Sequence, residues 1–140
     1  MSHLVIVAAG AVSPVGLSLA ETAASTRARV SRLREIEWRD RRFQPFIVGV
    51  VPDQGLPPLS PELSAQYLQY REARMLRIAH VALEETLQAL PGYETPIPVL
   101  LGMPEHHTTK PLESYAFLAK LSQQANEKLV LPRSMAASSE

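Results

Sequence analysis

The chain opens with the stretch Leu4-Val5-Ile6-Val7-Ala8-Ala9-Gly10, an apolar run with no polar alternation that ends at a glycine. A strand that is buried on both faces of a parallel sheet has this pattern. Ser13-Pro14 then supplies a helix N-cap residue and a proline at the first helical position. We therefore expect a buried strand over 4–9 and a helix from about Val15 to Arg34.

Two more apolar runs recur along the chain, Phe46–Val51 and Ile97–Gly102. The first is rich in β-branched residues and is followed by Pro52, which favours a second strand. In the other run, Pro98 lacks the N–H that a strand ladder needs, which favours a sheet edge or the beginning of a strand.

Helical patterns separate these runs. Leucines at three- and four-residue spacing between Pro61 and Leu90 predict a long helix, with a break near Tyr70 to Glu72. A similar pattern predicts a last helix from Leu112 to Leu129. The order β-α-β-α-β-α predicts one layered α/β/α domain over residues 1–131 with a mostly parallel sheet. Residues 132–140 are small and polar, and we expect a flexible tail there.

Composition excludes several classes of protein. The 140 residues are 46% hydrophobic and 20% charged, as in an ordinary globular domain. Lys plus Arg and Asp plus Glu number 14 each, a neutral balance that disfavours a nucleic-acid partner. The absence of cysteine removes disulfides, thiolate zinc sites and a cysteine nucleophile, and it suits a reducing compartment. No apolar run approaches the ~18 residues of a membrane helix. We expect a cytoplasmic protein without a membrane partner.

The turn between Gly10 and Gly16 invites comparison with phosphate-binding loops. Gly16 is followed by Leu17-Ser18 where a P-loop has lysine and then serine or threonine, and a dinucleotide fingerprint needs a third glycine. We interpret the turn as a tight connection between strand and helix and expect no cofactor. An unrelated small nucleotide-binding protein remains an alternative.

The histidines do not form a recognisable centre. Glu105-His106-His107 is the only histidine cluster, and it falls short of a complete tetrahedral metal site. His80 lies beside the apolar face of the long helical pattern, which is typical of a packed or partly solvated histidine. No serine is tied to a histidine and an acid. We assign no catalytic residue and no metal ligand.

Arginines are concentrated between Arg27 and Arg42, where seven of them accompany three acids and give a local net charge of +4. Such a cluster is either a docking patch for an anionic partner or the solvated end of a helix and its connector. The docking candidates are Arg32, Arg34, Arg39, Arg41 and Arg42.

The stretch Leu4–Gly16, with its Ala11-Val12-Ser13-Pro14-Val15-Gly16, resembles the opening of β-ketoacyl synthases, condensing enzymes of the thiolase-like fold. Ala8 stands where the family has the first glycine of the turn. Arg74–Leu87 is similar to the family's second helix, and Pro98–Gly102 to the end of its third strand. Residues 112–137 are similar to the helix and extended segment that precede the nucleophile.

The resemblance implies a partial thiolase-like N-terminal half. A parent enzyme would condense an acyl group, held as a thioester on cysteine, with a malonyl unit on an acyl carrier protein. The family's cysteine and two histidines lie beyond the matched segment, and none of His3, His80, His106 and His107 falls at their positions. We therefore expect this chain to be inactive by itself, contributing a scaffold, a dimer surface and a carrier-docking patch.

Family dimers join through antiparallel pairing of the third strand. The resemblance thus implies a homodimer, with Ile97, Val99, Leu100 and Leu101 as dimer-edge candidates, or the remainder of a longer chain beside this one. The alternative function is a stand-alone, degenerate thiolase-like module that acts through protein–protein contacts and has no enzymatic activity.

Overall fold

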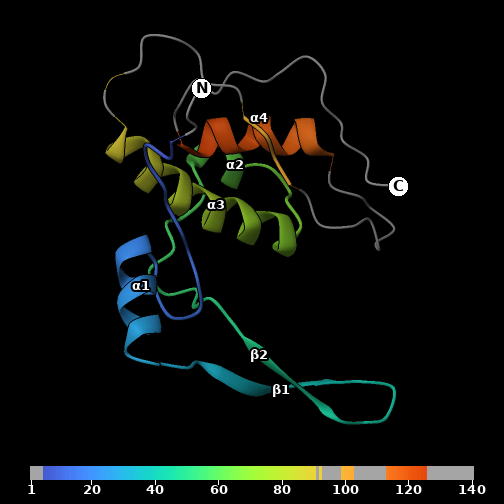
Figure 1. The fold of residues 1–140 in the computed structure, drawn as a ribbon. Helices are drawn as coiled ribbons and strands as arrows, with labels where there is room; N and C mark the ends of the chain where they lie inside the picture. Colours follow the sequence, from blue (N-terminus) through green and yellow to red (C-terminus); the bar gives the residue numbers. More distant parts are fainter. Residues whose placement is uncertain (1–4, 91, 93–98, 103–112, 126–140) are drawn as a thin grey trace. The chain divides into compact units, whose positions relative to one another are not determined.

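A computed structural model of the chain describes residues 5–90, 92, 99–102 and 113–125. These residues form four helices and a two-stranded antiparallel sheet (Figure 1). The elements are α1 Leu19–Arg27, β1 Leu33–Arg39, β2 Pro45–Gly49, α2 Pro61–Ser64, α3 Tyr70–Ala89 and α4 Ser114–Ala125. The chain divides into two compact units, Met1–Pro57 with Val81–Ala89 and Pro58–His80 with Leu90–Glu140.

The predicted layered α/β/α architecture with a mostly parallel β-α-β-α-β-α sheet, and with it the partial thiolase-like half, is wrong. Residues 5–12 have no regular secondary structure, and Val5, Ile6 and Val7 are 75%, 90% and 54% exposed. Residues 99–102 of the third run are also irregular, and 97 and 98 lie outside the described residues.

Among the residues that the structure describes, only the second predicted strand forms, and its pairing differs from the expectation. β2 pairs antiparallel with β1, which lies in the arginine-rich segment where no strand is predicted. A parallel sheet joins strands across long crossovers, whereas a hairpin closes over a few residues. The short connection between β1 and β2 therefore decides the pairing, and the apolar composition of the three runs does not.

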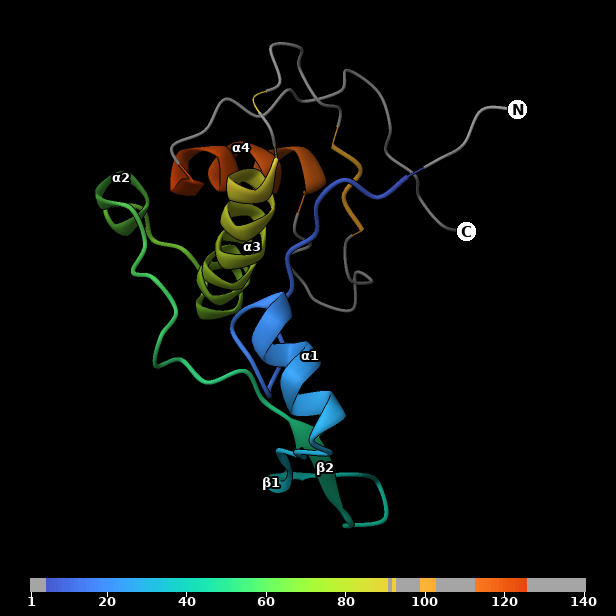
Figure 2. The same cartoon turned by 60° about the vertical axis from the view of Figure 1, so that its left-hand side comes forward.

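The hairpin, residues 33–49, is set by its turn (Figures 1 and 2). The Asp40 N–H donates to the Gln44 carbonyl at 2.9 Å, and the Phe43 N–H donates to the Asp40 carbonyl at 3.0 Å. The Asp40 carboxylate accepts from the backbone N–H groups of Arg42 and Gln44, both at 2.8 Å. The strand register shifts between Glu35 and Arg39, where β1 carries a bulge.

α1 is shorter than its sequence pattern predicts, and it begins after Ser18 and not at Ser13-Pro14. The Ser18 side chain caps α1 by accepting from the Glu21 N–H at 3.1 Å. The helix ends at Arg27, because Arg29 adopts a φ of 56° and the chain turns away. The predicted break in the long helical pattern falls at residues 65–69, between α2 and α3.

The second unit contains most of the buried apolar side chains that the structure describes. Leu63 of α2 and Leu76 of α3 are fully buried, and α4 contributes Phe117, Leu118 and Leu121. Glu72 of α3 forms an ion pair with Lys120 of α4. In the first unit, Leu56 alone among the described hydrophobic residues is buried. That unit therefore depends more on hydrogen bonds and close backbone packing than on a hydrophobic core.

Candidate functional site

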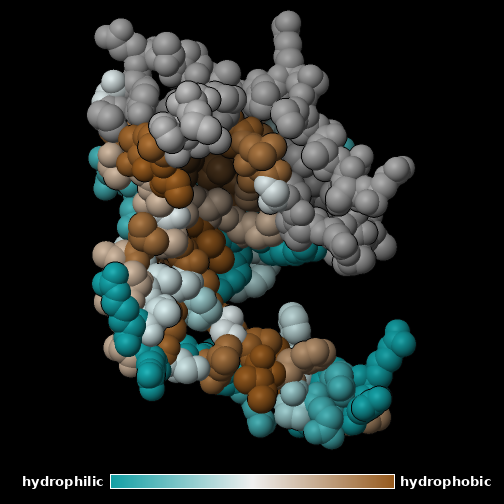
Figure 3. Space-filling model, viewed as in Figure 1, coloured by the Kyte–Doolittle hydropathy of each residue, from teal (hydrophilic) through white to brown (hydrophobic). Residues whose placement is uncertain are grey.

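The hairpin presents large apolar side chains to solvent. Trp38 and Phe43 are 75% and 80% exposed, and Leu33 and Ile47 are 65% exposed. Figure 3 shows apolar side chains over the middle of the hairpin and hydrophilic ones toward its turn. Exposed aromatic residues beside arginines are the composition that protein-binding surfaces favour.

A hollow of about 920 Å³ lies on this hairpin. Its lining includes Trp38 and Ile36 of β1 together with Val48 and Val50. Its charged lining consists of two arginines and two glutamates, namely Arg34, Arg39, Glu35 and Glu37. The charges in the hollow cancel, so the excess of positive charge lies at the two ends of the hairpin.

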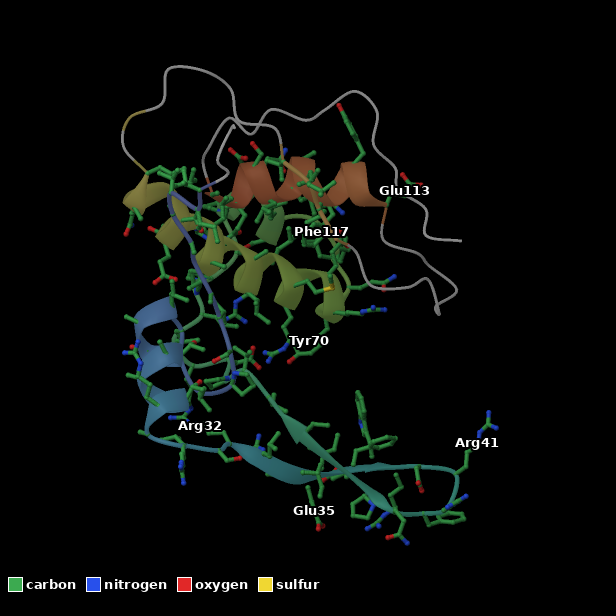
Figure 4. The ribbon with its side chains drawn as sticks, in the orientation of Figure 1. Arg32, Glu35, Arg41, Tyr70, Glu113 and Phe117 are labelled. Atoms are coloured by element: carbon green, nitrogen blue, oxygen red, sulfur yellow. The ribbon has the colours of Figure 1, made fainter. Side chains whose placement is uncertain are left out.

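The five docking candidates are distributed along the hairpin and its approach. Arg32 precedes β1, Arg34 and Arg39 lie within it, and Arg41 and Arg42 lie in the turn. Arg39 donates from its guanidinium to the Phe43 carbonyl at 3.0 Å and so stiffens the turn. Figure 4 shows Arg41 extending from the turn, at the end of the hairpin opposite Arg32. The structure thus spreads these residues along an edge rather than gathering them at one point.

Phe43 occupies a backbone conformation that disfavours it. Its φ of 61° places it in the left-handed region, which costs a residue with a Cβ about 1 kcal/mol. Hairpin turns of this kind usually place glycine there. Its ring remains 80% exposed, so intramolecular packing does not compensate the strain. Strain at an exposed aromatic residue points to a role outside the fold.

The turn between Gly10 and Gly16 is occupied by carboxylates of the chain itself. The Glu85 carboxylate accepts from the Ala11 N–H at 3.0 Å and from the Leu19 N–H at 2.9 Å. The Glu21 carboxylate accepts from the Leu17 N–H at 2.7 Å. These are the backbone donors that a phosphate group would need. The arrangement agrees with a structural turn and leaves the nucleotide-binding alternative without support.

A smaller hollow of about 420 Å³ lies beside this turn, between Ser13–Leu17 and α1, with Arg32 in its lining. Its serine hydroxyls are already engaged. Ser13 Oγ lies 2.9 Å from Thr22 Oγ1, and Ser25 Oγ donates to the Val15 carbonyl at 2.9 Å. The hollow therefore offers few unpaired polar groups to a ligand.

His80 is held by a buried glutamine. Gln124 Nε2 lies 3.0 Å from His80 Nδ1 and donates to the Pro58 carbonyl at 2.9 Å, while its Oε1 accepts from the Ser60 N–H at 2.8 Å. His80 is half-buried, which agrees with the predicted packed or partly solvated histidine. His80 therefore contributes to the structure of the second unit.

Other sequence candidates fall partly outside the described residues. The Glu105–His107 cluster and Ile97 lie there, while Val99, Leu100 and Leu101 belong to an irregular stretch. Within the described part of the chain, no three His, Cys, Asp or Glu side chains are grouped to hold a metal ion. Of the described helices, none is both long and apolar enough to cross a membrane.

Sequence reasoning overlooked Trp38 and Phe43, two of the three aromatic residues of the hairpin, and the role of Glu85. For the hairpin, the available signal was the alternation of apolar residues on both sides of a turn residue, Asp40. Ile36 and Trp38 precede Asp40, and Phe46 and Val48 follow it. For Glu85 the sequence offers no signal, because its partners are 66 and 74 positions away. No protein-family model, curated protein or solved structure matches the chain.

Proposed function

We propose that this chain is a non-catalytic protein-binding module that docks an acidic partner protein on its hairpin. The observation that carries the proposal is Phe43, an aromatic side chain held out into solvent at a strained φ of 61°. Interface hot spots are enriched in aromatic residues and arginine, and both are present along this hairpin.

The charges of the hairpin favour an acidic partner. The Asp40 carboxylate is used within the turn, where it accepts two backbone hydrogen bonds. Arg41 and Arg42 beside it are exposed, and Arg32 extends the basic character beyond the start of β1. The resemblance to condensing enzymes suggests an acyl carrier protein as this partner. We place the interaction in the cytoplasm, which suits a chain without cysteine.

A second candidate is a part of a β-ketoacyl-synthase-like protein in which this chain supplies no catalytic group. Parts of two blocks that carry the resemblance meet in the first unit, at Gly10 of the first block and at Ala82 and Thr86 of the second. A Cβ at Gly10 would lie 2.1 Å from the Ala82 carbonyl oxygen and 2.7 Å from Thr86 Oγ1. This contact explains why the position of the motif glycine admits no side chain.

The docking proposal is tested by titrating the chain with an acyl carrier protein. Trp38 is the only tryptophan and lies in the hairpin, so its fluorescence reports binding there. We expect a saturable fluorescence change whose affinity decreases with added salt. The double variant Arg41→Glu/Arg42→Glu and the single variant Phe43→Ala should each weaken binding about tenfold or more.

Arg71→Glu is the control, because Arg71 is an exposed arginine in the second unit. It should leave the affinity unchanged. An affinity for the carrier protein that changes neither with salt nor with any of the three hairpin substitutions would reject the proposed surface. Absence of any fluorescence change and of any heat of binding would reject the carrier protein as partner.

A further inference from the structure

The outer edge of β2 is a strand edge that no other described strand covers. β2 pairs with β1 alone in the two-stranded sheet. The Gln44 carbonyl accepts from the Asp40 N–H, so the backbone polar groups of Gln44 face β1. Along a strand, the backbone N–H and C=O groups of successive residues point to opposite sides, so those of residues 45, 47 and 49 point away from β1. The N–H and C=O groups of Ile47 and Gly49 and the Pro45 carbonyl therefore face away from β1.

The two edges of the hairpin differ in chemistry. Phe46–Val51 is a run of six uncharged residues with high β-propensity, and Ile47 within it is 65% exposed. β1 instead carries four charged residues and a bulge, features that protect a strand edge from pairing. β2 is thus the edge at which another strand can add without placing charges opposite one another.

We infer that β2 pairs antiparallel with β2 of a second copy of this chain, around a two-fold axis at Ile47. In antiparallel pairing, opposite residues point to the same face, so a symmetric pair requires one residue to lie opposite its own copy. With Ile47 on the axis, the two Ile47 residues exchange N–H···O=C bonds. Phe46 lies opposite Val48 of the second copy, and Gly49 donates to Pro45 of the second copy.

The absence of charge supports a second copy as the occupant. β2 carries no charged residue from Pro45 to Gly49, so an identical strand can lie beside it without placing like charges opposite one another. An acidic partner is instead drawn to the arginines of the turn and of β1.

Pairing would also remedy a weakness of the hairpin. Two strands alone are marginally stable in water, and three or more are needed for an independent sheet. Two copies joined at β2 form a four-stranded sheet in the order β1-β2-β2-β1. This inference does not depend on the acidic partner, because docking there uses the arginines of β1 and the turn.

The chain contains no cysteine, so a single introduced cysteine reports self-association directly. Ile47→Cys and Leu33→Cys form a matched pair, since both parent residues are 65% exposed on neighbouring strands. Under mild oxidation we expect Ile47→Cys to form disulfide-linked dimers in high yield. Leu33→Cys should form few, because the two β1 strands would lie three strand spacings, about 14 Å, apart. Equal cross-linking of both variants, or none at Ile47→Cys, would overturn the inference.

Sedimentation equilibrium provides a test without a covalent bond. We expect the unmodified chain to form a concentration-dependent dimer, Ile47→Lys to be monomeric, and Leu33→Lys to dimerise as the unmodified chain does. A monomeric unmodified chain at high micromolar concentration would overturn the inference. Arg41→Glu/Arg42→Glu should still dimerise, and Ile47→Lys should still bind the carrier protein, so each proposal can fail separately.

Discussion

The Glu85 carboxylate in α3 accepts two hydrogen bonds from the backbone N–H of Leu19, the first residue of α1, at 2.9 Å to Oε1 and 3.0 Å to Oε2. A negative charge at this position satisfies an unpaired amide and stabilises the helix dipole. The same carboxylate binds Ala11 in the preceding loop. One side chain therefore organises both the loop and the helix that follows it.

Replacing Glu85 by alanine should destabilise the first unit. Loss of these hydrogen bonds and of the charge at the helix terminus should lower the free energy of unfolding by about 1–2 kcal/mol. Denaturant titration followed by Trp38 fluorescence measures this loss, because Trp38 lies in the same unit. Glu84→Ala alters the exposed neighbour and should cost less than about 0.5 kcal/mol. Equal effects of the two substitutions would contradict the assigned role of Glu85.

Gly10 should tolerate no side chain. A methyl group there would lie 2.1 Å from the Ala82 carbonyl oxygen, a backbone atom of α3 that cannot move alone. Gly10→Ala is expected to destabilise the first unit by about 2–3 kcal/mol. The matched control is Gly92→Ala, since a Cβ at Gly92 would meet nothing within 4 Å. Thermal unfolding of both variants decides the matter, and an unchanged midpoint for Gly10→Ala would refute the close packing.

Gln124 should be required for stability of the second unit. Gln124→Leu retains a similar volume but leaves the Ser60 N–H and the Pro58 carbonyl without their partner. Each unsatisfied buried group costs about 1–3 kcal/mol, so we expect a loss of about 2–4 kcal/mol. Gln123→Leu changes the exposed neighbour and serves as the control. Helix loss followed by far-UV circular dichroism during denaturation measures both, and a Gln124→Leu chain as stable as its control would contradict the network.

Phe43→Gly should separate stability from binding. Glycine adopts the φ of 61° without strain, so the hairpin should gain about 1 kcal/mol and its strand amides should exchange more slowly with solvent. Carrier-protein affinity should decrease at the same time, because the exposed ring is lost. Phe43→Asn also tolerates this backbone conformation and provides a second comparison. Affinity that remained unchanged in both variants would show that the strained ring is not a docking residue.

The helices could be predicted from the sequence more completely than the strands. Ser60-Pro61 begins α2 as predicted, through interactions within one helical turn. For α1 the predicted cap at Ser13 is wrong, because Ser18 caps the helix three residues before Glu21. The apolar spacing of α3 and α4 likewise depends on near neighbours. The end of α1 differs from the sequence-based expectation, because a positive φ at Arg29 stops the helix. The break between α2 and α3 lies at residues 65–69, just before the predicted Tyr70 to Glu72.

Whether a segment forms a strand depends on the segment that pairs with it, and the hydrophobic pattern of the sequence does not specify that partner. Val5–Val7 has the composition of a buried strand, yet these residues are exposed and unpaired among the described segments. Leu33–Arg39 contains four charges and still forms β1, because the turn at Asp40 brings β2 back beside it. For the candidate site, the sequence identified the arginines, but not Trp38 and Phe43, whose importance follows from exposure and backbone geometry.

The division of the chain within α3 has a consequence for biosynthesis. The first unit combines residues up to Pro57 with Val81–Ala89, so its loop and first helix cannot acquire the Glu85 carboxylate until the ribosome has translated more than twenty further codons. Nascent residues 5–57 must therefore wait in an incomplete state, without the hydrogen bonds from Ala11 and Leu19 to Glu85. A translational pause before codon 85 would lengthen that interval, and faster elongation through this region would shorten it.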